Sequence, residues 1–155
     1  KELDLNEMVY NIANTFTLRV EHTGGKIYTE IEAVDSTVYV DEMHFQNVIF
    51  NLLDNAVKYR KPNTPLDIFL KTWNENDYII LSIRDTGLGI KKDNIKKIFD
   101  KFYRVHTGNV HDVKGFGLGL AYVKQIVDIN GGEITVESEY GKGTTFTIKL
   151  PIIKN

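Results

Sequence analysis

The stretch HFQNVIFNLLDNAVKYR, residues 44–60, has the hydrophobic spacing of an amphipathic helix, and we expect the other elements to be arranged around it. Its apolar residues recur every three or four positions, which places them on one side of a helix facing a core. They are Phe45, Val48, Ile49, Leu52, Leu53 and Ala56. The spacing predicts one helix over 44–60, ended by the following Lys61-Pro62, because proline disfavours helical geometry in the residue before it.

A polar stripe rich in amide side chains adjoins this apolar face. Asn47, Asn51 and Asn55 follow one another at four-residue spacing, and Lys58 continues the stripe. Asparagine is a poor helix former, so the stripe weakens the helix that carries it. Two interpretations are open: a solvent-exposed face that happens to be rich in amides, or the wall of a polar pocket. Such a wall offers neutral oxygen and nitrogen atoms to a cation and its anionic ligand.

Composition limits the class of protein. The 155 residues, 42% of them hydrophobic, are enough for one domain with a core. A formal net charge of −2 and the lack of a long basic run argue against a general nucleic-acid or membrane-surface binder. The absence of cysteine excludes disulfides and thiol chemistry and fits a cytoplasmic protein. We expect a single domain over 1–155, cut from a longer protein, without a signal peptide or direct membrane contact.

Hydrophobic periodicity predicts the other elements. A helix over 4–20 begins behind an Asp or Asn cap. Alternation of apolar and polar residues predicts strands at 26–34, 37–40, 66–73 and 77–85 and a closing hairpin at 133–151. Helical spacing predicts a further helix at 121–130. The strands 66–73 and 77–85 read as an antiparallel hairpin. Residues 91–105 predict a short helix pinned by Ile95, Ile98, Phe99 and Phe102, and the polar stretch 106–115 predicts a mobile binding loop.

One carboxylate shares a strand face with buried residues. Period-two alternation in 77–85 aligns Asp85 with Ile79, Leu81 and Ile83. Burial of an unpaired charge is costly, so we expect a hydrogen-bonding partner for Asp85, from the chain or from a bound molecule. The alternative is that the strand ends at Arg84 and that Asp85 begins a turn.

The glycine-rich stretch GFGLGL, residues 115–120, opens a predicted helix. The first N–H groups of a helix have no partner within it, and the helix dipole favours negative charge there, so this stretch is a candidate phosphate site. Taken alone it is weak evidence, because the same spacing occurs in structural turns and the stretch lacks the ending of a Walker loop.

Four segments in order resemble the N, G1, F and G2 boxes of sensor histidine kinases: NLLDNAVKY (51–59), DTGLGI (85–90), IFDKFYRV (98–105) and GFGLGL (115–120). The closing GKGTTFTIKLP (141–151) resembles the last hairpin of their ATP-binding domain. The resemblance implies the Bergerat fold, an α/β (α+β) two-layer sandwich. Its sheet is mixed and mostly antiparallel, three main helices cover one face, and an ATP lid spans about 91–116.

The resemblance also implies residues that hold the adenine and the ribose side of ATP. Asp85 would accept a hydrogen bond from the adenine amino group, and Gly87 and Gly89 would let the backbone pass close to the base. Thr144 would lie near the adenine through water. The other implied nucleotide contacts on this side are Tyr59, which would lie along the nucleotide, and Ile90.

A second implied set of residues serves the phosphates. Asn55 would be the side-chain ligand of Mg²⁺, which otherwise keeps waters and phosphate oxygens. Asn51 and Lys58 would contact phosphates or metal-bound water, and Arg104 would reach the terminal phosphate. The remaining implied contacts are Tyr103, Lys114 and, through backbone N–H groups, Gly115, Gly117, Leu118, Gly119 and Leu120.

The implied reaction is transfer of the γ-phosphoryl group of ATP to a histidine, with Asn51, Lys58 and Arg104 as catalytic residues. Hydrolytic relatives have a glutamate base at the position of Asn51, whereas an amide takes up no proton at neutral pH. The implied partners are a histidine-bearing dimerisation domain, expected to be absent from this chain, and a response regulator. The parent would then be a sensor, with this portion in the cytoplasm. The alternatives are a nucleotide-sensing pseudokinase and a serine kinase of the anti-sigma type.

Overall fold

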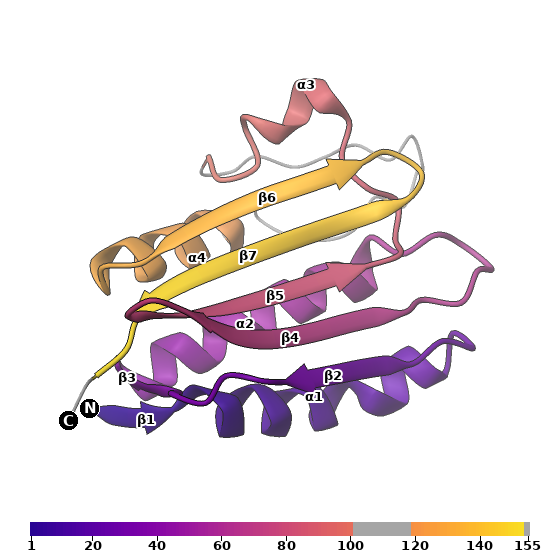
Figure 1. Cartoon of the computed structure of the whole chain (residues 1–155). Helices are drawn as coiled ribbons and strands as arrows, with labels where there is room; N and C mark the ends of the chain where they lie inside the picture. The colour runs from indigo at the N-terminus through magenta and orange to yellow at the C-terminus, as the bar shows by residue number, and fades with distance from the viewer. Residues whose placement is uncertain (101–118, 154–155) are drawn as a thin grey trace.

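The computed structural model describes residues 1–100 and 119–153 (Figure 1). Its helices are α1 (Leu5–Glu21), α2 (Glu42–Lys58), α3 (Lys92–Ile95) and α4 (Gly119–Ile129). Its strands are β1 (Glu2–Asp4), β2 (Ile27–Ile31), β3 (Thr37–Tyr39), β4 (Ile68–Glu75), β5 (Tyr78–Asp85), β6 (Glu133–Glu139) and β7 (Gly143–Pro151). The predicted loop 106–115 and most of the predicted lid lie outside the described residues.

One five-stranded sheet carries the fold, in the order β2-β4-β5-β7-β6. The β2–β4 pair is parallel and the other neighbours are antiparallel, so the sheet is mixed and mostly antiparallel. The helices α1, α2 and α4 lie together on one face of it (Figure 1). These two layers confirm the predicted α/β sandwich, and β5, which ends at Asp85, is its middle strand.

Helix α2 lies between α1 and α4 on the sheet (Figure 1). The Asp41 side chain caps it by accepting a hydrogen bond from the His44 N–H at 2.9 Å, so the helix begins earlier than predicted. It ends at Lys58 because the backbone of Tyr59 leaves the helical region. The buried side of α2 consists of the predicted residues and one more: Phe45, Val48, Ile49, Leu52, Leu53, Ala56 and Val57.

A buried polar network fixes α1 to the sheet. The Asn6 amide donates to the Ala33 carbonyl at 2.9 Å and accepts from the Thr72 hydroxyl at 2.7 Å. The Ala33 N–H donates to the same hydroxyl at 3.3 Å. Thr72 is fully buried, and these bonds satisfy its polar atom while they set how α1 meets β4.

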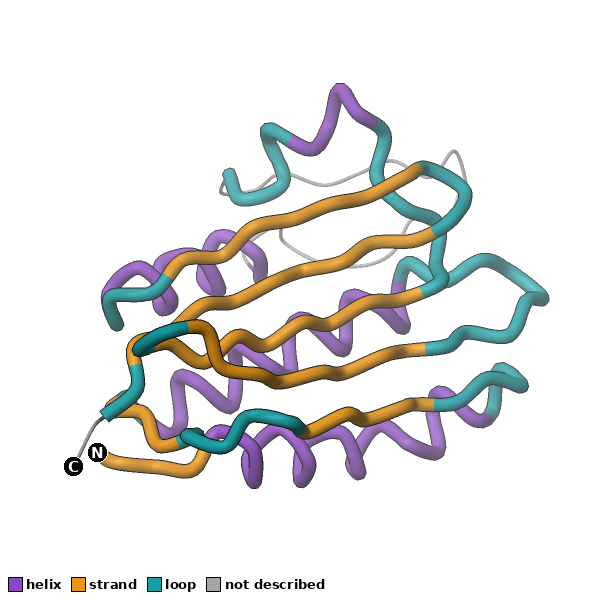
Figure 2. Tube along the Cα trace, viewed as in Figure 1, coloured by secondary structure: helices purple, strands orange, loops and turns teal. Residues whose placement is uncertain are grey.

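The face of the sheet opposite α1, α2 and α4 is turned towards the viewer in Figure 2. Long side chains on this face contact one another. The rings of Tyr28 and Phe69 stack at 5.0 Å, and the Arg84 guanidinium lies 4.1 Å from the Phe69 ring centre. The Lys149 ammonium lies 4.3 Å from the ring centre of Tyr78. Ile80, on this face, lies between Trp73 of β4 and Lys149 of β7, and these long side chains explain why it is only 4% exposed.

Several sequence predictions are refined by the structure. The predicted strand 26–34 is shorter, Ile27–Ile31, and β1, which pairs with β3, has no signal in the sequence. In the closing hairpin Ile134 pairs with Ile148 and Val136 with Phe146, as predicted. Of the residues predicted to pin the short helix, Ile98 is buried and Phe99 meets Phe146 edge to face, whereas Phe102 lies outside the described residues.

None of the helices within residues 1–100 and 119–153 combines the length and the apolar character needed to cross a lipid bilayer.

Candidate functional site

Asp85 is the last residue of the middle strand β5. It pairs with Thr144 on β7 and with Ile68 on β4, so the strand includes it and the alternative of a turn beginning at Asp85 is wrong. Its face also carries Ile79, Leu81 and Ile83, which are buried. The carboxylate therefore enters the layer between sheet and helices, as the alternation predicts.

Burial raises the pKa of the Asp85 carboxyl to about 6, and hydrogen bonds from the backbone N–H groups of Gly87 and Thr144 oppose that rise. The Gly87 bond is 2.8 Å long and ends on Oδ1. At neutral pH the group is mostly ionised, and a carboxylate has acceptor capacity beyond these bonds. The partner expected for Asp85 is thus supplied in part by the chain, with capacity left for a ligand that donates a hydrogen bond.

The glycine turn, residues 86–90, is held from three directions. Its Leu88 N–H donates to the Tyr59 carbonyl at the end of α2 at 2.9 Å. The Leu88 carbonyl accepts from the Gly141 N–H, in the turn between β6 and β7, at 2.6 Å. The Ile90 N–H donates to the Ser138 hydroxyl of β6 at 2.7 Å. The turn is therefore a fixed wall beside Asp85.

Both glycines of this turn are required by protein contacts. A Cβ on Gly87 would lie 2.8 Å from the Tyr59 carbonyl oxygen and 2.9 Å from Asp85 Oδ1. Gly89 has φ of +74° and lies against the Glu139 carbonyl, so a side chain there would be both strained and obstructed. Their predicted closeness to an adenine base stays a prediction.

Ser138, which the sequence reasoning missed, joins the parts of this region. Its hydroxyl donates to the Gly143 carbonyl at 2.9 Å and lies 2.8 Å from the hydroxyl of Thr144, which is 7% exposed. With the Ile90 bond, Ser138 links the glycine turn to the strand that carries Thr144. The signal was available, because alternation in β6 aligns Ser138 with the inward-facing Ile134 and Val136, as it aligns Asp85 in β5.

The amide stripe of α2 is divided by burial. Asn47 is exposed, whereas Asn51 and Asn55 are half-buried near the C-terminal end of the helix. Gly119, the first residue of α4, lies against Asn51: a Cβ on this glycine would be 3.7 Å from the Asn51 side-chain oxygen. The N-terminal end of α4 therefore meets the stripe, and the wall interpretation fits Asn51 and Asn55 but not Asn47.

Lys58, by contrast, is engaged elsewhere. Its ammonium lies 2.9 Å from Oδ2 of Asp54, one helical turn earlier, and Oδ1 of Asp54 lies 3.0 Å from the Arg19 guanidinium of α1. The sequence reasoning placed Lys58 with the phosphates and did not single out Asp54. The structure thus brings Asn51 and Gly119 together, leaves Asn55 half-buried one turn further along α2, and pairs Lys58 with a carboxylate.

The remaining predicted residues divide into two groups. Leu120 is half-buried against the core, and the described part of α4 already includes Gly119 and Leu120, which precede the predicted start at 121. Ile90 also packs partly against the core. Six predicted residues lie outside the described part of the chain: Tyr103, Arg104, Lys114, Gly115, Gly117 and Leu118.

The donor set of this region suits one kind of metal ion. Across residues 1–100 and 119–153, no three His, Cys, Asp or Glu side chains come together as metal ligands do. The half-buried oxygen donors of the α2 stripe are the amides of Asn51 and Asn55, which are neutral. Such a set fits Mg²⁺, which keeps several waters and takes phosphate oxygens as ligands, with a single protein side chain.

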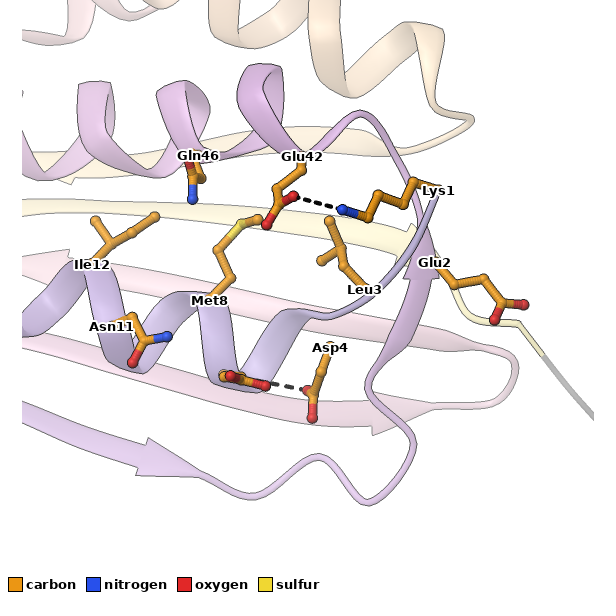
Figure 3. Close-up of a pocket in the computed structure, with 10 residues that line it drawn as sticks. Lys1, Glu2, Leu3, Asp4, Met8, Asn11, Ile12, Glu42 and Gln46 are labelled. Carbon is orange, nitrogen blue, oxygen red and sulfur yellow. Dashed lines mark hydrogen bonds and ion pairs between the residues drawn. The ribbon is translucent and has the colours of Figure 1, made fainter.

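A pocket of about 260 Å³ lies elsewhere, between β1, α1 and the start of α2 (Figure 3). Lys1 pairs with Glu42 at 3.0 Å beside it, and Met8 and Gln46 are among its lining residues. It contains none of the predicted site residues, so the candidate site is the region of Asp85, the glycine turn, α2 and the start of α4.

Comparisons with known proteins show the family of the chain. Residues 40–154 match the family described as histidine kinase-, DNA gyrase B- and HSP90-like ATPases. The chain is 58% identical over all 155 residues to the sensor protein RprX of Bacteroides fragilis, of which it covers 30%. It is 45% identical over 112 residues, 72% of this chain, to the sensor protein SrrB of Staphylococcus aureus, of which it covers 19%. It thus spans less than a third of either relative.

Solved structures show the same fold. The mycobacterial sensor histidine kinase MprB superposes with a TM-score of 0.81 at 25% identity, over 100% of both chains. The catalytic domain of histidine kinase ThkA superposes with a TM-score of 0.83 at 24% identity, over 98% of this chain and 97% of that one. The chain therefore belongs to the histidine kinase-, DNA gyrase B- and HSP90-like ATPase family, as an ATP-binding catalytic domain of the sensor histidine kinase type.

Proposed function

We propose that this chain holds ATP between the glycine turn, α2 and the start of α4, and transfers its γ-phosphoryl group to a histidine on a separate dimerisation domain, for relay to a response regulator aspartate. The observation that carries the proposal is Asp85. An ionisable carboxylate lies among buried residues at the end of the middle strand, beside a fixed turn and opposite a helix with half-buried amides. Perturbed carboxylates in such positions mark functional sites.

Asp85 recognises adenine by accepting a hydrogen bond from its amino group. Guanine has a carbonyl oxygen at that place, which a carboxylate repels, so the pocket prefers adenine. The glycine turn lies along the base without rearrangement, because its three hydrogen bonds already hold it. Thr144, paired with Asp85 across the sheet, completes this side, and Tyr59 lies along the nucleotide.

The phosphates lie at the start of α4. The backbone N–H groups of Gly119 and Leu120, in the first described turn of α4, donate to phosphate oxygens, and the helix dipole adds to the attraction. Asn51 and Lys58 contact the phosphates from α2, and Asn55 holds Mg²⁺ through its amide oxygen. When bound, Mg²⁺ neutralises charge on the phosphate oxygens. Tyr103, Arg104, Lys114, Gly115, Gly117 and Leu118 complete the contacts in this proposal.

The chemistry of Asn51 favours transfer over hydrolysis. An amide takes no proton from water at neutral pH, so the chain does not activate water as an attacking group. The nucleophile comes from the partner domain: the lone pair of an imidazole nitrogen attacks the γ-phosphorus, the bond to the β-phosphate oxygen breaks, and ADP leaves. The solved complex of the histidine kinase ThkA with the response regulator TrrA is a relative's example of the later relay partner.

Incubation with radiolabelled ATP tests the proposal. The chain alone should bind ATP, turn it over slowly and label itself weakly, whereas the helical acceptor domain of the parent, added separately, should become labelled. Transfer is expected to be slow because an untethered acceptor has a low effective concentration. The Asp85→Asn variant is the control and should lose label on the acceptor. Strong self-labelling, or turnover as fast as that of a dedicated ATPase, would contradict transfer to a partner histidine.

A further inference from the structure

Asp54 binds two cations from different helices. Its Oδ2 lies 2.9 Å from the Lys58 ammonium of its own helix, and its Oδ1 lies 3.0 Å from the Arg19 guanidinium of α1. The Asp54 side chain is 19% exposed, and those of Lys58 and Arg19 are 40% and 45% exposed. Each carboxylate oxygen therefore has one cation, and the lysine is the one proposed to bind phosphate.

The position of Lys58 on α2 gives its side chain two directions. With about 100° of rotation per residue in an α-helix, Lys58 lies roughly 20° from Asn51 around the helix axis and roughly 40° from Asp54, between the two. A long, flexible lysine side chain in that position reaches either the carboxylate on the α1 side or the amide stripe on the α4 side. In this structure it is on the carboxylate.

We propose that Asp54 is a positioning residue that holds Lys58 away from the phosphates until a bound triphosphate competes for it, and that Arg19 then keeps the Asp54 charge paired. The inference rests on the proposed function, because it concerns how Lys58 reaches the phosphates of ATP. It assigns a role in nucleotide binding to two residues outside the predicted site: Asp54, roughly 60° from Asn51 around the axis of α2, and Arg19 of α1.

Arg19 is suited to this role because one further contact helps to hold it in place. Its guanidinium lies 4.9 Å from the ring centre of Phe16, a buried residue of α1. When Lys58 leaves, Asp54 keeps a charge-assisted hydrogen bond and is not left as an unpaired, mostly buried carboxylate. When Lys58 moves, its ammonium leaves the Asp54 carboxylate and pairs with the triphosphate, which carries more negative charge.

Equilibrium binding of ATP and adenosine to the 155-residue chain tests the proposal, with four proteins: the natural chain, Asp54→Asn, Lys58→Met and the double variant. Asp54→Asn should increase the affinity for ATP about twofold to fivefold, which corresponds to the free energy of a partly exposed ion pair. Adenosine affinity should not change, since it has no phosphate. The gain should be absent in the Lys58→Met background, whereas a general effect of removing negative charge would persist there.

Two further variants sharpen the result. Arg19→Gln should change the affinity in the opposite direction and weaken ATP binding, because Lys58 is then the remaining cation that pairs with Asp54 and is held more tightly there. Asp128→Asn is the matched control: it breaks an i,i+4 pair with Lys124 of 3.0 Å on α4 and removes the same charge. It should leave both affinities unchanged.

The outcomes separate this inference from the proposed function. Equal gains with and without Lys58, or parallel shifts for ATP and adenosine, overturn the role of Asp54 while ATP binding itself stands. A natural chain that binds neither ligand overturns both. Thermal unfolding of each variant checks that the fold is retained, since a purely structural role would lower the melting temperature without separating ATP from adenosine.

Discussion

At the scale of single residues, the Asp85 carboxylate is costly to the free protein. Burial raises its pKa to about 6, from an ordinary value of 3.8, so the folded chain binds this proton more tightly than the unfolded chain does. The stability that comes from the protonated form is complete below about pH 4 and is lost as the pH rises through about 6. At neutral pH the fold holds a partly buried charge, and a ligand with a donor group would relieve that cost.

Asp85→Asn should therefore stabilise the free chain above pH 6, because an amide carries no charge and its oxygen can still accept the Gly87 N–H. The pKa shift corresponds to about 3 kcal/mol, which solvent around a half-buried group reduces to about 1–2 kcal/mol. Urea unfolding at pH 4 and pH 8 measures it: the gain should appear at pH 8 and shrink at pH 4. Calorimetry on the same variant should show loss of ATP and adenosine binding. A variant that is less stable at pH 8, or that still binds adenosine normally, would contradict this role.

At the scale of elements, the hairpin of β6 and β7 determines the shape of the side of the site that we propose for adenine. The Ser138 hydroxyl accepts a hydrogen bond from the Ile90 N–H, donates to the Gly143 carbonyl and contacts the Thr144 hydroxyl. One small side chain therefore joins the glycine turn to β7, the strand that pairs with Asp85. The turn is also tied to α2 through Leu88 and Tyr59. The site is thus a junction of three elements far apart in the sequence.

Ser138→Ala should loosen this junction. The Ile90 N–H loses its partner, so we expect a loss of about 1–3 kcal/mol in the free energy of unfolding. Affinity for adenosine and for ATP should fall by the same factor, because the adenine wall is affected and the phosphate side is not. Denaturant unfolding and competition binding measure both. Ser82→Ala, the same change on β5 facing the other side of the sheet, is the control and should have little effect on binding. A loss confined to ATP would argue against Ser138 as a support of the adenine wall.

At the scale of the whole molecule, the site draws on both layers of the sandwich. Asp85 and Thr144 come from the sheet, whereas Asn51, Asn55 and Gly119 come from the helical layer. A ligand that contacts both layers binds only the folded chain, and it therefore raises the stability of the fold by mass action.

ATP with Mg²⁺ should accordingly raise the melting temperature of the chain, with a stabilisation of about 2.7 kcal/mol at a ligand concentration of a hundred times the Kd. Removal of Mg²⁺ with a chelator should reduce the ATP-induced shift and leave the adenosine-induced shift unchanged. Asn55→Ala should abolish the part of the shift that depends on Mg²⁺, and Asn47→Ala, on the exposed part of the stripe, serves as its control. Thermal shift measurements decide this. An ATP effect independent of Mg²⁺ would count against Asn55 as the metal ligand.

Local pattern determined much of this protein from the sequence alone. Apolar spacing predicted α1, α2 and both hairpins, and alternation placed Asp85 on the buried face of β5, because side-chain direction follows from the periods of helix and strand. The order of the boxes predicted the family and the fold class. Boundaries were less accurate: α2 begins at Glu42 and ends at Lys58 because a side-chain cap and one backbone angle decide them.

Only the tertiary structure determined which distant residues meet. The structure pairs β2 with β4 in parallel, pairs β1 with β3, links Ser138 to the glycine turn and joins Arg19 of α1 to Asp54 of α2. All these contacts join residues far apart in the chain. No period within one segment encodes such contacts, because each depends on how two elements pack. The resemblance of the sequence therefore predicted Lys58 as a phosphate ligand, and the fold showed that Lys58 pairs with Asp54, a carboxylate that it shares with Arg19.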